Sequence, residues 1–189
     1  MTVQEIWLPY DHLDYRGDKT FGDLPKTLHP WADPAVDPVD PTHGAGDVRR
    51  YDLPTPDQID ALHAPSFAKM DECCQAINKK IGRADPVIEV VPVGQAMNAL
   101  RRRIVAGTAP GILKQSALFA DVIGHPKAAI MALSAYCHFA VIYHRSPVGL
   151  KNLPVLEREH LPEALNSLLQ ELAWSAVTGH PLSGVHAQR

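Results

Sequence analysis

The stretch PVIEVVPVGQAMNALRRRIV, residues 86–105, decides the fold class. Residues 87–94 are rich in β-branched side chains and end at a glycine, which is typical of a buried strand. Residues 95–105 have apolar side chains at helical spacing and predict a helix, with arginines 101–103 on its wetter side. The predicted inward positions of this helix are Ala96, Ala99, Leu100 and Ile104. A strand, a glycine turn and a helix in this order are typical of an α/β layer.

Further elements on either side extend this pattern. The apolar run at residues 6–9 predicts a strand, and apolar periodicity predicts helices over residues 66–82, 127–143 and 162–177. Ser66 is the expected N-cap of the first of these helices. The predicted inward positions of the helix at 66–82 are Phe67, Met70, Cys74, Ile77 and Ile81. Those of the helix at 127–143 are Ile130, Leu133, Cys137, Ala140 and Val141, and those of the helix at 162–177 are Leu165, Leu168, Leu169, Leu172 and Ala176. We therefore expect residues 1–189 to form one α/β domain with a mainly parallel sheet flanked by helices.

Composition and charge exclude several function classes. The formal net charge is −3 at pH 7, and the basic residues are scattered apart from arginines 101–103, so neither nucleic acid nor an anionic membrane is an expected partner. No apolar run approaches the roughly 18 residues of a membrane span, and the first residues lack the pattern of a signal peptide. Three cysteines cannot build a disulfide framework. These features predict a cytoplasmic protein.

Residues 25–56 are rich in proline. Repeated prolines fix φ and remove backbone hydrogen-bond donors, so this segment is expected to be a long irregular excursion without a long helix or strand. A disordered segment and a lid or substrate-facing loop both fit this composition.

Three segments together resemble SGNH-type (GDSL-like) hydrolases. They are IEVVPVGQA at residues 88–96, LFADVIGHP at 118–126 and AYCHFAVIYHRSPVGL at 135–150. The resemblance implies a partial flavodoxin-like layer and hydrolysis of a small ester or a carbohydrate ester by a Ser-His-Asp arrangement. It also implies that His125 is the base and Asp121 the carboxylate that orients it, because a serine hydroxyl is a weak nucleophile until a base takes its proton.

The spacing of the acidic and basic residues departs from the family pattern. The family has Asp-x-x-His, whereas one more residue separates Asp121 from His125 in this chain. Gly124 can absorb the additional residue, because glycine adopts backbone angles that other residues avoid. Asp121 as an ordinary loop carboxylate and His125 as a structural histidine are the alternatives.

No serine occupies the position that the resemblance requires of a nucleophile. The sequence has no Gly-x-Ser turn after a strand before Ser66. Ser66 fits a helix cap, Ser134 lies in a predicted helix, Ser146 precedes proline, and Ser116 remains formally available. We therefore expect the chain to be N-terminally incomplete or inactive as it stands. The alternative is a non-catalytic binding or interaction module on the same fold.

Cofactors and metals are not expected from the sequence. The ten histidines show no tight helical ligand spacing with supporting carboxylates. If the chain is active, its expected partner is a small-molecule ester or carbohydrate-ester substrate. A second copy of the chain is the other partner left open, since an incomplete layer exposes apolar surface.

Overall fold

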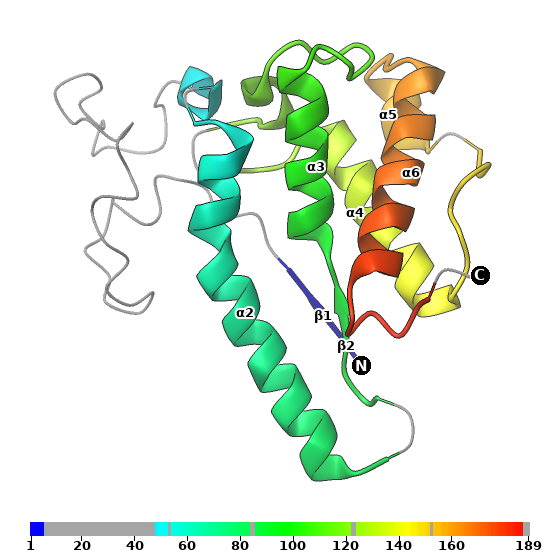
Figure 1. The fold of residues 1–189 in the computed structure, drawn as a ribbon. Coiled ribbons are helices and arrows are strands. Elements are labelled where there is room, and N and C mark those ends of the chain that lie inside the picture. Colours follow the sequence, from blue (N-terminus) through cyan, green and yellow to red (C-terminus); the bar gives the residue numbers. More distant parts are fainter. Residues whose placement is uncertain (6–47, 53, 84–85, 122–123, 152, 187–189) are drawn as a thin grey trace, which may run out of the picture.

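The computed structural model describes residues 1–5, 48–52, 54–83, 86–121, 124–151 and 153–186. Its strands are β1 (Thr2–Gln4) and β2 (Glu89–Val91), and its α-helices are α2 (Pro56–Ile81), α3 (Val93–Val105), α4 (Ala128–Tyr143), α5 (Pro154–Arg158) and α6 (Glu163–Gly179). Two 3₁₀ helices are η3 (Val48–Asp52) and η4 (Gln115–Leu118). The fold is mixed α/β and mostly helical, with the strands between α2 and the group of α3, α4 and α6 (Figure 1).

The sheet of the described residues is small and parallel. Thr2 pairs with Glu89, and the two following residues of each strand continue the register. The N–H of Glu5 extends this ladder to the carbonyl of Val91 at 3.0 Å. On the other side of β2, the N–H of Val90 donates to the carbonyl of Leu182 at 2.9 Å. The α/β class is thus confirmed, and the strand expected at residues 6–9 lies outside the described residues.

Helix α4 lies at the centre of the packing. It contacts α3, α5, α6, β2 and η4, and its most extensive contact is with α6. All five inward positions predicted for α4 are buried, as are Leu165, Leu169 and Leu172 of α6. Leu168 and Ala176 are half-buried against the same core. The periodicity of both helices therefore identified the faces that form the main core.

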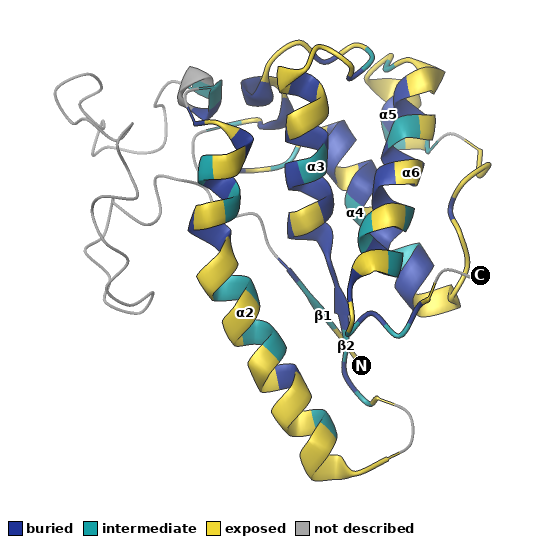
Figure 2. Ribbon diagram, viewed as in Figure 1, coloured by how far each residue is buried: buried dark blue, intermediate teal, exposed yellow. Residues whose placement is uncertain are grey.

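Helix α2 differs from its prediction in where it begins and in the exposure of its last two apolar residues. It begins at Pro56 because Thr55 and Gln58 form a capping box, in which each side chain accepts a hydrogen bond from the other residue's backbone N–H. Ser66 is therefore inside the helix and is not its cap. Ile77 and Ile81 were expected to face inward but are exposed, because the C-terminal half of α2 projects beyond the rest of the fold (Figures 1 and 2).

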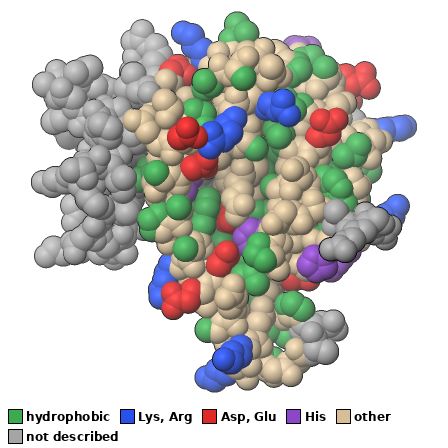
Figure 3. All heavy atoms as spheres, viewed as in Figure 1, with side chains coloured by type: hydrophobic (Ala, Val, Ile, Leu, Met, Phe, Trp, Pro, Cys, Tyr) green, Lys and Arg blue, Asp and Glu red, His purple; other side chains and the backbone are tan. Residues whose placement is uncertain are grey.

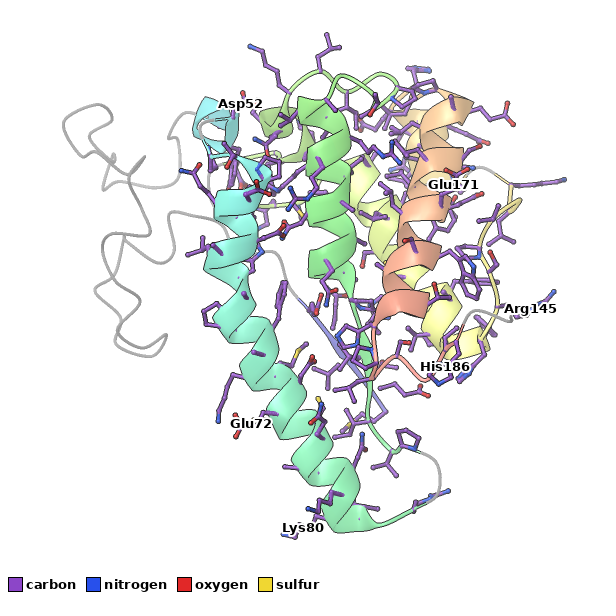
Figure 4. All side chains as sticks on the ribbon, in the orientation of Figure 1. Asp52, Glu72, Lys80, Arg145, Glu171 and His186 are labelled. Atoms are coloured by element: carbon purple, nitrogen blue, oxygen red, sulfur yellow. The ribbon has the colours of Figure 1, made fainter. Side chains whose placement is uncertain are left out.

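The projecting half of α2 is nevertheless tied to β2. The Asn78 side chain accepts hydrogen bonds from the N–H groups of Val87 and Ile88 at 3.0 and 2.9 Å, and it donates to the carbonyl of Ile88 at 2.8 Å. Charged side chains such as Glu72 and Lys80 point away from the body along this half (Figure 4). The helix thus has a solvated outer face and one polar anchor near its end.

The prediction that all three arginines of α3 lie on its wetter side is wrong for Arg101. Arg101 is only 1% exposed, because its Nη1 donates to Gln115 Oε1 at 3.0 Å and its guanidinium lies 5.2 Å from the centre of the Phe119 ring. Arg102 and Arg103 are exposed as expected, and Arg102 forms ion pairs with Asp57 and Asp60 of α2. Figure 3 shows basic and acidic side chains meeting between the upper parts of α2 and α3.

The N-terminus of α3 is capped from a distant part of the chain. Its N-cap residue, Pro92, makes no side-chain capping hydrogen bond. The carboxylate of the buried residue Glu5 accepts from the Gln95 N–H at 3.1 Å and from Gln95 Nε2 at 2.7 Å. A carboxylate is favoured here because the first N–H groups of a helix are unpaired and carry partial positive charge. This contact fixes the end of β1 against α3.

The proline-rich segment is only partly described. Residues 25–47 and residue 53 lie outside the described residues. Val48–Asp52 forms the short helix η3, where the Tyr51 ring stacks on Phe119 at a centroid distance of 4.0 Å. The end of the segment, Pro56, begins α2.

We expect iodoacetamide to label Cys73 and to spare Cys74 and Cys137 in the folded protein. All three cysteines are free, but only Cys73 is exposed, and burial raises the pKa of the other two thiols. Intact-mass measurement near neutral pH should show one added group, and the urea-unfolded protein should accept three as the control. Rapid labelling of Cys137 without urea would contradict the packing of α4.

Candidate functional site

Asp121 and His125 lie on one closed loop between η4 and α4. Phe119 and Pro126 form an antiparallel bridge across its base, and the Ala120 N–H donates to the His125 carbonyl at 2.8 Å. The Lys127 N–H donates to the Leu118 carbonyl at 2.9 Å. These bonds hold the two ends of the loop together, although residues 122–123 lie outside the described residues.

The Asp121 carboxylate contacts His125 at two points. Its Oδ1 accepts from the His125 backbone N–H at 3.1 Å, and its Oδ2 is hydrogen-bonded to the ring Nδ1. The side chains are 31% and 65% exposed, respectively. A carboxylate on Nδ1 fixes the tautomer of a neutral imidazole, so that Nε2 is the nitrogen able to accept a proton. The arrangement therefore gives an oriented, solvent-accessible imidazole.

Gly124 absorbs the additional residue between the pair. Its φ is 85°, in the left-handed region that glycine enters without steric cost. Its N–H lies 3.4 Å from the Asp121 carbonyl, which closes a tight turn just before His125. The departure from the family spacing is therefore compatible with contact between the two side chains.

The described serines do not supply a nucleophile to His125. All seven serines of the chain are described, and none of them hydrogen-bonds to the His125 ring. They are Ser66, Ser116, Ser134, Ser146, Ser167, Ser175 and Ser183. Ser134 donates from within α4 to Gln4, and Ser146 accepts from the Val148 N–H. Ser66 lies within α2.

Ser116 is paired with a carboxylate instead. Its hydroxyl donates to Asp52 Oδ2 at 2.7 Å and its N–H donates to Asp52 Oδ1 at 2.8 Å. An open hollow of about 240 Å³ adjoins this pair, which is smaller than a typical ligand pocket. It is lined by Asp52, Ile104, Val105, Leu113, Lys114 and Gln115. Asp52 is labelled in Figure 4, at the end of η3 nearest α2.

The described residues contain neither a metal-binding cluster nor a membrane-spanning helix. Within the described residues, no group of three or more His, Cys, Asp or Glu side chains has the arrangement of a metal site, and no helix is long and apolar enough to cross a membrane. Comparisons of the chain with protein-family models, curated proteins and solved structures found no match.

Proposed function

We propose that His125 is the general base, and Asp121 the carboxylate that orients it, in an SGNH-like hydrolase site for a small ester or a carbohydrate ester. The observation that carries this proposal is the bidentate contact of the Asp121 carboxylate with the His125 N–H and ring Nδ1, on an exposed loop. In the reaction, His125 Nε2 accepts the proton of the attacking hydroxyl, and Asp121 stabilises the imidazolium that forms.

The proposal extends to the fold and the compartment. The parallel pair β1 and β2, with α2 on one side and α4 on the other, is compatible with part of a flavodoxin-like layer. The three free thiols fit a reducing cytoplasm. Because none of the described serines bonds to His125, the nucleophile would be water or a hydroxyl from another source.

A second candidate is a binding module that performs no chemistry. The same observation favours it, since an oriented histidine without a neighbouring serine can recognise a ligand by hydrogen bonding alone. A fluorophosphonate probe separates the two candidates in part: labelling of a serine supports a serine hydrolase, whereas binding of an ester without labelling or turnover supports the module.

The direct test is hydrolysis of p-nitrophenyl acetate by the wild-type chain and two histidine variants. His125→Ala is expected to lower kcat/KM at least about 100-fold, the usual contribution of a positioned general base. His186→Ala is the matched control, because His186 is also exposed and lies near the end of the described chain (Figure 4). It should change the rate less than about twofold, since an isolated imidazole contributes only weak background catalysis. Equal, small effects of both variants would contradict the proposal.

A further inference from the structure

A buried polar cluster joins four elements at the end of β1. Glu5 follows β1 and is held by Gln95 of α3, His180 follows α6, and Asp71 lies near the middle of α2. His180 Nε2 lies 3.6 Å from Glu5 Oε1 and 3.5 Å from Asp71 Oδ1. The side chains of His180 and Glu5 are 2% and 0% exposed, and that of Asp71 is 25% exposed, so water reaches the cluster at Asp71.

The backbone fixes which nitrogen of His180 faces the carboxylates. The Leu182 N–H donates to His180 Nδ1 at 3.1 Å, so Nδ1 acts as an acceptor and the hydrogen of the neutral ring is on Nε2. A proton on Nδ1 would place its N–H group directly opposite the Leu182 N–H, and the two donors would repel each other. A single Nε2–H therefore faces two carboxylates, at distances longer than a normal hydrogen bond.

Glu5 and Asp71 differ in how well their charges are compensated. Glu5 accepts two hydrogen bonds at the positive end of α3. Asp71 Oδ1 is buried and has no hydrogen-bond partner among the described residues. Burial raises the pKa of Asp71, Glu5 raises it further, and His180 opposes both effects. An additional proton is therefore bound more favourably at Asp71 than at an ordinary aspartate.

The other titratable groups around the cluster do not supply a positive charge. Cys74, on the same helix as Asp71, and Cys137 of α4, which faces Glu5, both have thiol pKa values raised by burial and stay neutral. Within the described residues, His180 is the basic side chain within ion-pair distance of either carboxylate. The charge of the cluster thus changes with the protonation state of Asp71.

We propose that Asp71 is a proton-operated latch that holds the middle of α2 against the end of β1 and the segment after α6. In the protonated state, the neutral carboxyl group packs beside Glu5 and His180 without charge repulsion. In the ionised state, a second, partly buried negative charge faces Glu5, and α2 opens more readily toward water. The pKa of Asp71 is higher in the folded, closed state than in the unfolded or opened state. The stabilisation is therefore complete below the unfolded-state pKa and is lost as the pH rises through the folded-state pKa.

Hydrogen exchange of the α2 amides between pH 4 and 8, corrected for intrinsic exchange rates, tests the latch. In the wild type, protection around Asp71 should fall as the pH rises, by about tenfold for each unit that separates its closed-state and open-state pKa values. Asp71→Asn, which keeps the shape without the charge, should abolish this dependence. Glu72→Gln is the matched control, because Glu72 is the adjacent exposed residue and pairs only with Lys69 among the described residues; it should behave as the wild type.

Four results would overturn the proposal. The first is a wild-type protection profile that does not change with pH, and the second is an Asp71→Asn profile that keeps the wild-type slope. The third comes from NMR titration of the wild-type protein, which needs no variant: a carboxyl signal of Asp71 that titrates at or below the value of about 3.9 of an ordinary aspartate. The fourth is a His180 Nδ1 signal that titrates while the Asp71 signal does not change, because the proton would then bind to His180 and not to Asp71.

Discussion

Replacing Leu133 by alanine is expected to lower the free energy of unfolding by about 2–5 kcal/mol. Leu133 is fully buried on α4, the helix that contacts most of the other elements of the core. Truncation removes apolar contacts and leaves a cavity that the surrounding helices cannot fill completely. Urea denaturation followed by circular dichroism measures the change as a lower midpoint at an unchanged slope.

The matched control is Met131→Ala on the same helix. Met131 is 50% exposed, so its truncation removes less packing and should cost less than about 1 kcal/mol. Comparable losses in the two variants would indicate that α4 does not present Leu133 to the core. A lower slope for Leu133→Ala would indicate a change in the unfolded state and would require a different assignment of the effect.

The second large effect is expected for Glu5→Ala, with a loss of about 2–4 kcal/mol. The variant removes the carboxylate that caps α3, so the Gln95 N–H and Nε2 lose their buried acceptor. Hydrogen bonds to a charged group contribute about 1.5–3 kcal/mol each, and the cost lies toward the lower end here because Gln95 itself is exposed. Urea denaturation gives the total loss, and exchange of the Gln95 amide locates it.

Glu5→Gln provides the comparison for the capping role. Its amide oxygen can accept from one of the two Gln95 donors, so the loss should be smaller than for the alanine variant. Retention of Gln95 amide protection in Glu5→Ala would show that the cap does not stabilise the first turn of α3. The proposed latch at Asp71 would still be tested independently by its own pH dependence.

The sequence predicted those features that depend on neighbouring residues. The inward face of α4 follows from its apolar spacing, and the end of α2 follows from Gly82, whose φ of 66° provides a left-handed C-cap. The contact between Asp121 and His125 could also be predicted from the sequence, since both residues lie on one short loop. Thr55 and Gln58 carry the signal for the start of α2, but Pro65, directly before the expected cap Ser66, is typical of a position outside a helix.

Features that depend on distant residues could not be predicted in the same way. Arg101 is buried because Gln115 and Phe119 lie beside it, and nothing in the local pattern of α3 indicates those neighbours. Asp52 reaches Ser116 across 64 positions of the sequence. The cluster of Glu5, Asp71 and His180 likewise combines residues from three separate segments. Periodicity gives the face of one element and carries no information about which elements meet.

The pairing of β1 with β2 has a consequence for the order of folding. The hydrogen bond between Gln95 and Glu5 joins residues 90 positions apart, whereas α4 and α6 lie close together in the sequence. Closing a loop over such a separation costs conformational entropy, and this cost arises before the contacts that compensate for it have formed. The helical group of α3, α4 and α6 should therefore assemble first. The first strand then docks onto this preformed surface in a late step, whose rate depends on the chain between the strands.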